Sequence, residues 1–523
     1  MKVTRRIPNN FLRALLCIAM AGTVPALALD GDTAIHDPST VVFDAGRYYT
    51  YGTGGLPTLS SADGWTWQRQ GSVMATLPGG KPGEATLARG GNNSWAPDVI
   101  RVGDQFFMYY SAPGTQPRSA IGLLIGKTLD PASPDYGWRD AGPVVWSDGV
   151  EDSNAIDPGV LLDPTDGRLW MVYGSYFGYI RLVELDTKTG LRRHPNKPAT
   201  NVAINSEAAI LIYRDGWYYL LVTHGSCCQG ANSTYNIRMG RSRKVTGPYL
   251  DNMGVDMIEG GGKLFAASRG RHIGAGHFGL LDLGEGVQKF SLHYEADLDR
   301  GGISVLDIRP LLWRDGWPVA GDNLASGTYS IESARTGTVL ELAVQGFPVG
   351  GFRQRPPGPP PGSATGSAPG AAAGGPPAGP PPPPRPGPPV ADQGPADVAA
   401  NWPAVTGVRL APAMLQAQQK WVIAPAPNAG GYPGAPYYRI TIAGSERSLT
   451  ATAGGELEAR AFTGAAEQLW RLDQLADGSW RISPKSIPGT TATLALSAVG
   501  SSMPTLARFD PASDRQRWLL GAP

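Results

Sequence analysis

Three carboxylates, one indole and one imidazole occupy the same position in a repeated pattern of the chain. Each stands eleven to thirteen residues ahead of a residue inside an aromatic-rich run, at Asp37, Trp95, Asp157, Glu207 and His277. Carboxylates that lie close together raise one another's pKa and cost folding free energy, so three acids gathered in one place indicate a function. Carboxylates and imidazoles transfer protons as general acids and bases.

Five aromatic-rich runs, each expected to be a strand that follows a tight turn, would bring these residues together. The runs are GRYYTYG from Gly46, DQFFMYYS from Asp104, GRLWMVYGS from Gly167, GWYYLLVT from Gly216 and VQKFSLHYE from Val287. Their spacing of roughly 50 to 70 residues predicts an all-β fold, a five-bladed β-propeller. The innermost strands of a propeller begin at one face of the axial channel, so the five residues would converge there. A β-sandwich or two unrelated β domains is the alternative.

The composition limits the kinds of partner. The 523 residues include 45 Lys and Arg against 44 Asp and Glu, which gives a formal net charge of +1. This balance offers no electrostatic basis for binding nucleic acid or an anionic membrane, whereas neutral polymers such as glycans remain open. The length predicts two or three domains.

The first 28 residues have the layout of a secretory signal peptide. Basic residues precede an apolar stretch, and a pattern of small residues ends at Ala26, Leu27 and Ala28. We therefore predict cleavage after Ala28 and a secreted protein, extracellular or periplasmic. No later run is long enough to span a bilayer, so no membrane contact of the mature form is expected. An uncleaved N-terminal anchor is the alternative.

Beyond that segment the chain holds two cysteines, Cys227 and Cys228, which are adjacent. Adjacent Cα atoms lie closer together than the usual span of a disulfide, so both a pair of buried thiols and a bridge between neighbours are open. A metal site is not expected from two adjacent cysteines that lack spaced partners.

An ordered set of short motifs fills the stretch from Ile35 to about Gly321. The motifs are HDPS, SWAPD, NAIDPG, YGSYFG, SEAA, CCQG, STYNI, GRS and TGPY. Over this stretch, a little more than half of the chain, the sequence resembles the arabinanases of glycoside hydrolase family 43. The resemblance implies a five-bladed propeller and inverting hydrolysis of glycans that contain arabinose.

Matched by motif, the resemblance implies that Asp37 is the general base and Glu207 the general acid, and that Asp157 sets the pKa and orientation of the acid. An inverting glycosidase uses one carboxylate to activate water and a protonated acid to serve the leaving oxygen, roughly 6.5 to 9.5 Å away. A third negative charge beside Glu207 would keep that acid protonated near neutral pH.

The remaining predicted site residues concern metal and sugar binding. The resemblance implies that His277 in GAGHFG ligates one calcium ion held otherwise by water, and a hydrogen-bonded core histidine is the alternative. Trp95 is expected to stack on a sugar ring, or else to pack between blades. His36, Asn154 and Ser175 are candidates for contacts with sugar hydroxyls.

A short motif occurs three times in the C-terminal part. The triplets QKW, QLW and QRW place tryptophans at positions 421, 470 and 518, which are 49 and 48 residues apart. This repeat resembles the ricin-type β-trefoil, and we predict such a domain over residues 322–523 after a propeller over residues 29–321. Whether it binds sugar stays open.

A Pro- and Gly-rich tract covers about residues 350–395. Its composition is typical of an interdomain linker. However, the spacing of the C-terminal repeat indicates that the tract lies within the first lobe. One lobe spans 38 positions from Trp480 to Trp518, whereas the matching span from Tyr329 to Trp421 is 92. We therefore predict a disordered loop inserted in the first lobe, with the domain join near Gly321.

These observations predict a secreted inverting hydrolase that cleaves plant cell-wall arabinan within its α-1,5-linked chain and acts as a monomer. An exo-acting arabinofuranosidase or β-xylosidase of the same family is one alternative. A non-catalytic glycan-binding protein, built from a propeller and a trefoil, is the alternative from another class.

Overall fold

The computed structural model describes residues 29–115, 117–150, 153–343, 405–500 and 503–522. The predicted signal peptide (1–28) and the predicted inserted loop (350–395) lie outside these residues. Within the described ranges, no helix is long and apolar enough to cross a membrane.

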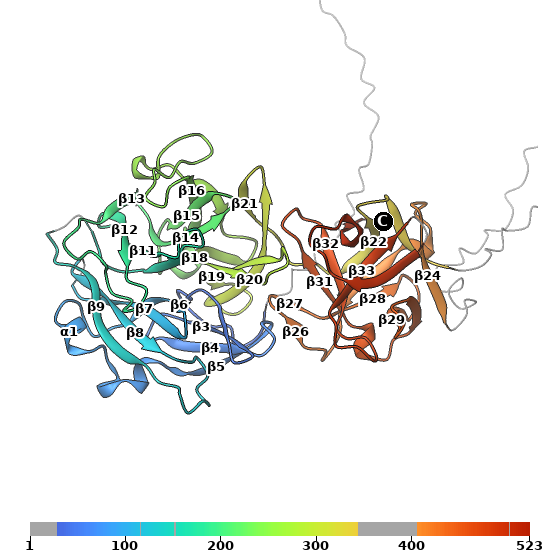
Figure 1. Cartoon of the computed structure of the whole chain (residues 1–523), viewed down its shortest axis with the longest axis horizontal. Coiled ribbons are helices and arrows are strands. Elements are labelled where there is room, and N and C mark those ends of the chain that lie inside the picture. The colour runs from blue at the N-terminus through green and yellow to red at the C-terminus, as the bar shows by residue number, and fades with distance from the viewer. Residues whose placement is uncertain (1–28, 116, 151–152, 344–404, 501–502, 523) are drawn as a thin grey trace, which may run out of the picture.

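The N-terminal part forms five antiparallel sheets that surround one axis (Figure 1). The first two sheets are β2 (Val42–Asp44), β3 (Arg47–Tyr51), β4 (Pro57–Ser61) and β5 (Thr66–Ser72), then β6 (Trp95–Val102), β7 (Gln105–Pro113), β8 (Ser119–Gly126) and β9 (Arg139–Ser147). The next two are β10 (Gly159–Leu162), β11 (Leu169–Tyr173), β12 (Tyr179–Leu185) and β13 (Thr200–Ile204), then β14 (Glu207–Arg214), β15 (Trp217–His224), β16 (Asn236–Ser242) and β17 (Lys263–Ala266). The fifth is β18 (His272–Asp282), β19 (Gln288–Asp297), β20 (Ile303–Arg314) and β21 (Trp317–Ala320). The predicted five-bladed β-propeller is confirmed.

The aromatic-rich runs form the second strand of each blade, where both faces are covered. In β7, Phe106, Met108 and Tyr110 pack in one core cluster with Tyr49 and Tyr51 of the first blade. The alternate residues of the same strand, Phe107 and Tyr109, pack with residues of the third blade. Because successive side chains of a strand point to opposite faces, a strand between two blades is apolar throughout.

The ring is closed by the segment that leads to the first predicted acid. Strand β1 (Asp30–Gly31) pairs in parallel with β5 of the first blade. The following residues contact the fifth blade, where Ala34 pairs with Val305 and the Leu306 amide donates to the Thr33 carbonyl at 2.9 Å. This segment ties the first blade to the last and delivers His36 and Asp37 to the axis.

The C-terminal part is built from short strands, ten of which join in one sheet. Its strands are β22 (Gly327–Ser333), β23 (Thr338–Leu342), β24 (Thr406–Pro412), β25 (Trp421–Pro425), β26 (Gly431–Tyr432), β27 (Ala435–Pro436), β28 (Tyr438–Ile442), β29 (Arg447–Ala451), β30 (Leu457–Ala461), β31 (Trp470–Gln474), β32 (Trp480–Pro484), β33 (Leu494–Val499), β34 (Met503–Arg508) and β35 (Trp518–Gly521). Strands β23 and β24 pair with each other, so residues 344–404 connect two neighbouring strands of this part.

The three Gln-x-Trp triplets have the same hydrogen bonds. The indole N–H groups of Trp421, Trp470 and Trp518 donate to the backbone carbonyls of Leu340, Leu449 and Leu496 at 2.8, 2.9 and 2.9 Å. The glutamine two residues before each tryptophan accepts a backbone N–H through its side-chain oxygen, at Gln419, Gln468 and Gln516. All three tryptophans are fully buried. The threefold spacing in the sequence therefore reflects a threefold repeat of packing.

The two parts share a packed interface (Figure 1). The amide of Gly434 donates to the Gly64 carbonyl at 3.0 Å, and the amide of Trp313 donates to the Ala476 carbonyl at 2.8 Å. Val287 of the propeller lies in one apolar cluster with Leu475, Ala495 and Phe509.

Candidate active site

One cavity of about 690 Å³ lies where the innermost strands of the blades begin. Its lining residues are His36, Asp37, Thr53, Trp95, Ile156, Asp157, Ser175, Tyr176, Phe177, Glu207, Gly225, Ser226, Cys227, Cys228, Tyr235 and His277. The structure thus brings together the three predicted carboxylates, Asp37, Asp157 and Glu207, which come from the first, third and fourth blades.

Local backbone geometry turns these side chains toward the axis. Asp37, Asp157 and His277 have φ values of 48°, 57° and 54°, and the residues after Trp95 and Glu207 have φ values of 38° and 48°. Left-handed backbone is uncommon in residues other than glycine and concentrates at functional sites. The strand register also shifts next to Trp95, Glu207 and His277, as in β-bulges that redirect a side chain.

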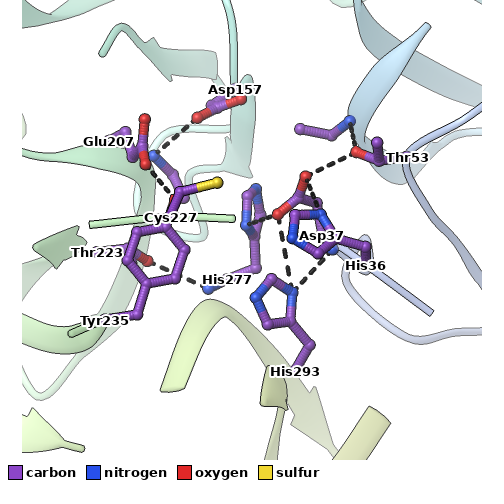
Figure 2. Close-up of polar contacts among 12 residues, drawn as sticks. His36, Asp37, Thr53, Asp157, Glu207, Thr223, Cys227, Tyr235, His277 and His293 are labelled. Atoms are coloured by element: carbon purple, nitrogen blue, oxygen red, sulfur yellow. Dashed lines mark hydrogen bonds and ion pairs between the residues drawn. The ribbon is translucent and has the colours of Figure 1, made fainter. Parts of the chain in front are cut away.

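Side chains of neighbouring blades hold this backbone in place. The amide of Asp37 donates to Nδ1 of His293 at 2.8 Å, and the amide of Asp157 donates to Oγ of Ser111 at 2.8 Å. The amide of His277 donates to Oγ1 of Thr223 at 3.1 Å (Figure 2). Each left-handed position therefore has a dedicated acceptor, which offsets part of its conformational cost.

Asp37 is an anion held by two imidazoles. Nδ1 of His36 lies 2.8 Å from Oδ2, Nδ1 of His277 lies 3.0 Å from Oδ1, and Thr53 donates its hydroxyl to Oδ2 at 2.7 Å (Figure 2). Burial alone would raise the pKa of Asp37, but His277 and His36 outweigh it and hold that pKa well below its usual value. This carboxylate is therefore ionised at neutral pH.

Glu207 and Asp157 form a buried pair on the other side of the cavity. Ser175 donates its hydroxyl to Oε2 of Glu207 at 2.8 Å, and Tyr235 donates its hydroxyl to Oε1. Burial raises the pKa of Glu207 against these two hydrogen bonds. Burial also raises the pKa of Asp157 to about 8, with Glu207 and Asp37 adding to the effect against His277. The pair therefore retains a proton near neutral pH.

The other predicted contacts divide into two groups. His36, Trp95 and Ser175 line the cavity, although the Ser175 hydroxyl is engaged by Glu207. Asn154 is fully buried, accepts a hydrogen bond from Oγ of Ser119 at 2.9 Å, and lies outside the set of lining residues. The structure does not bring Asn154 to the cavity.

Several residues of the site were not predicted from the sequence. His293 and Glu295 stand two apart in β19, so both point toward the axis, where Glu295 contacts His36. The signal was two ionisable residues at strand spacing inside the aromatic-rich run VQKFSLHYE. Tyr235, in the motif STYNI, contacts Glu207, and Tyr176 and Phe177 form part of the cavity wall.

The adjacent cysteines are joined in a disulfide, Cys227–Cys228. This resolves the two alternatives that the sequence left open. The bridge lies in the loop after β15, and both cysteines line the cavity; Figure 2 shows Cys227.

Two groups of three potential metal ligands occur within the described part of the chain. They are His36 with Cys227 and Cys228, and His36 with Asp37 and His293. In the first group both sulfurs belong to the disulfide, so neither is a thiolate that could bind a metal. Neither group contains His277, whose Nδ1 faces Asp37.

A comparison with protein families matches residues 31–318 to the family described as Glycosyl hydrolases family 43. The chain is 35% identical over 295 residues to the extracellular endo-α-(1→5)-L-arabinanase 1 of Bacillus subtilis (strain 168), a match that covers 54% of this chain and 87% of that protein. It is 34% identical over 324 residues to the extracellular exo-α-(1→5)-L-arabinofuranosidase ArbA of Cellvibrio japonicus (strain Ueda107), which covers 58% of this chain and 90% of that protein.

Solved structures of arabinanases are also similar to this chain. An exo-1,5-α-L-arabinanase from a bovine ruminal metagenomic library has a TM-score of 0.51 and 34% identity, with 56% of this chain and 99% of that chain covered. An α-L-arabinanase of Cellvibrio cellulosa in complex with arabinohexaose has a TM-score of 0.51 and 31% identity, with 55% of this chain and 96% of that chain covered.

Proposed function

Because the chain belongs to glycosyl hydrolase family 43, we propose that it hydrolyses α-1,5-linked L-arabinan, as an endo-acting arabinanase with inversion at the anomeric carbon. The observation that carries this proposal is the cavity in which an ionised carboxylate, Asp37, lies across from a carboxyl pair that retains a proton, Asp157 and Glu207. A proton acceptor and a proton donor on one cavity are what inverting hydrolysis requires.

In the proposed reaction Asp37 takes a proton from a water molecule while the water oxygen bonds to the anomeric carbon. The glycosidic carbon–oxygen bond breaks on the opposite face, and Glu207 gives its proton to the leaving oxygen. The products are an inverted hemiacetal and a shortened chain. Protons then exchange with solvent, which restores an ionised Asp37 and a protonated Glu207.

Asp157 has the proposed task of keeping the proton on Glu207. Ser175 and Tyr235 both donate to Glu207, an arrangement that by itself favours the anion. When the one proton of the pair is on Glu207, Asp157 is the anion and its charge opposes that effect. Oδ2 of Asp157 also accepts the amide of Ala208, next to the acid, at 3.3 Å. The two hydroxyls would then orient the carboxyl group toward the scissile oxygen.

The wall of the cavity supports binding of a sugar chain. Trp95 offers an indole, and the exposed rings of Tyr176 and Phe177 line the same cavity. Such apolar faces pack against the carbon face of a furanose, while polar groups such as His36 contact hydroxyls. Asn154 has no part in this proposal, since it lies outside the lining.

The same proposal includes one calcium ion near His277. Because Nδ1 of His277 faces Asp37, Nε2 is the nitrogen left for a ligand. Calcium takes six to eight ligands, mostly oxygen, so these residues fit only as one direct ligand in a shell of water. When bound, the ion would add positive charge beside the carboxylates. Calorimetric titration with calcium should give a binding signal that His277→Ala abolishes.

For the remainder of the chain, the repeated hydrogen bonds of the Gln-x-Trp triplets support a ricin-type β-trefoil over residues 322–523. Its first repeat offers an acid, Glu341, but this carboxylate accepts hydrogen bonds from Arg409 and Gln419. Residues 1–28 are proposed to direct secretion, which agrees with two relatives named extracellular. We propose a monomer.

An exo-acting arabinofuranosidase is the second candidate, because relatives of similar identity carry endo and exo names. A time course of products from linear arabinan separates the two. Endo action yields a ladder of oligosaccharides from the first minutes, whereas exo action yields one short product throughout. Absence of any reducing sugar would contradict both.

A further inference from the structure

The disulfide of the cavity wall is connected to a residue outside the cavity. The amide N–H of Cys228 donates to Oε2 of Glu295 at 3.0 Å. Glu295 stands on β19 of the fifth blade, and 2% of its side chain is exposed. The loop after β15 of the fourth blade is therefore fixed to the fifth blade by one buried carboxylate.

From Glu295 the contacts continue to the proposed base. Oε1 of Glu295 lies 2.9 Å from Nε2 of His36, and Nδ1 of His36 lies 2.8 Å from Oδ2 of Asp37. His293 reinforces the path, because its Nδ1 accepts the amide of Asp37, which leaves its Nε2 to carry a proton 3.4 Å from Glu295. Glu295 thus supports Asp37 through two imidazoles.

We propose that the Cys227–Cys228 disulfide and Glu295 position the carboxylate of Asp37 for attack by water, so that reduction of this disulfide lowers turnover. The inference rests on the proposed function for the role of Asp37. In this proposal Glu295 is a positioning residue, since it acts through His36 and does not line the cavity.

The physical reason lies in the backbone of Cys228. Its φ is 62°, a left-handed value that residues other than glycine keep only where the surroundings impose it. The covalent bond between neighbouring side chains is one such constraint. Once the bond is cut, Cys228 is free to return to a common conformation, and its amide leaves Glu295. The buried carboxylate of Glu295 then loses a hydrogen-bond donor, and Glu295 no longer fixes the position of His36.

The reduction itself needs a dithiol as the electron source. One thiolate of the dithiol attacks a sulfur of the protein disulfide and forms a mixed disulfide, and its second thiolate displaces the protein sulfur. The protein gains two thiols, and the dithiol becomes a cyclic disulfide. Removal of the reductant and mild oxidation reverse the change.

The test compares turnover on linear arabinan for the untreated enzyme, the enzyme reduced with dithiothreitol, and two sets of variants. The double variant Cys227→Ser and Cys228→Ser removes the bridge, and Glu295→Ala removes the carboxylate. We expect each to lower kcat about tenfold, with KM changed less than twofold, because displacement of a catalytic group by a fraction of an ångström lowers rate more than binding. Glu285→Gln, a carboxylate change far from the cavity, is the matched control.

A combined experiment separates positioning from direct contact with sugar. If the disulfide acts through Glu295, reduction of the Glu295→Ala enzyme should cause little further loss, whereas independent effects would multiply. A rise in KM on reduction with kcat unchanged would overturn the proposal and make the disulfide a sugar contact. Full kcat in the reduced enzyme would overturn it as well.

Two measurements keep the outcome clear. Thermal unfolding identifies a variant that is merely unstable. In that case the unsubstituted enzyme is reduced and reoxidised, and recovery of kcat on reoxidation supports the proposal. Asp37→Ala tests the proposed function separately. If Asp37→Ala is inactive while the Glu295 and cysteine variants keep full turnover, the positioning proposal alone is wrong.

Discussion

The two parts of this molecule are both built from repeats, and they use equivalent positions in opposite ways. In the propeller, the equivalent position in or just ahead of the innermost strand of each blade carries side chains of four types, namely Asp37, Trp95, Asp157, Glu207 and His277, at or next to left-handed backbone. In the C-terminal part, equivalent positions carry the same glutamine and tryptophan three times, with the same hydrogen bonds. Divergence at a repeated position indicates chemistry, and identity indicates packing.

Removal of the carboxylates of Asp37 and Glu207 tests this comparison most directly. We expect Asp37→Ala and Glu207→Ala each to lower kcat on arabinan by about 10² to 10⁴-fold, because each removes a proton-transfer group. Rates come from reducing-sugar release, and thermal unfolding checks that both variants are folded. A rate above about a tenth of the unmodified enzyme in either variant would refute its role.

The next largest effect concerns the identical positions. Trp470→Ala should lower the free energy of unfolding by about 3 to 5 kcal/mol, because it empties a fully buried site. Trp421→Ala and Trp518→Ala should behave alike, and kcat should stay unchanged wherever the protein is folded. Chemical denaturation measures this series. A large loss of kcat without loss of stability would break the distinction between the two parts.

A smaller effect tests the carboxyl pair. Asp157→Asn removes the carboxylate that is ionised when Glu207 holds the proton of the pair, so the pKa of Glu207 falls. The acid must be protonated to act, and activity is lost as pH rises through its pKa. The alkaline limb of kcat/KM against pH should therefore move to lower pH by about one unit. An alkaline limb that stays in place would argue against this role for Asp157.

The smallest expected effect is on KM and concerns the aromatic wall of the cavity. Trp95→Ala should raise KM several-fold with kcat less affected, since an aromatic stacking contact contributes about 0.5 to 1.5 kcal/mol. Initial rates over a range of arabinan concentrations measure it. Asn154→Ala is a matched polar change outside the lining, and it should leave KM as it is. Equal effects of the two substitutions on KM would contradict the proposed contact between Trp95 and the sugar.

Much of the fold followed from spacing in the sequence. The interval between the aromatic-rich runs varies, but the offset ahead of each run is nearly constant, and this offset was sufficient to locate Asp37, Asp157 and Glu207. The threefold interval of the tryptophans likewise located the repeat of the C-terminal part. Both patterns are periodic because each blade or lobe must bury the same kind of face.

What spacing could not predict depends on contacts between distant segments. His293 and Glu295 lie in a strand whose aromatic composition indicated packing alone, and their role arises only when the fifth blade meets the first. Asn154 lies in an irregular segment where no period fixes the direction of a side chain. The sequence left open whether the adjacent residues Cys227 and Cys228 are thiols or a disulfide, since adjacent cysteines alone do not specify their oxidation state.

The central claim is that acids from separate blades act together across one cavity. Proton NMR of the first sugar released from linear α-1,5-arabinan tests it most directly, because the anomeric signal reports stereochemistry before mutarotation. The account predicts that the first product is the β-anomer, formed by inversion, and that Asp37→Ala and Glu207→Ala yield none. Initial release of the α-anomer, or release by either variant at the unmodified rate, would contradict it.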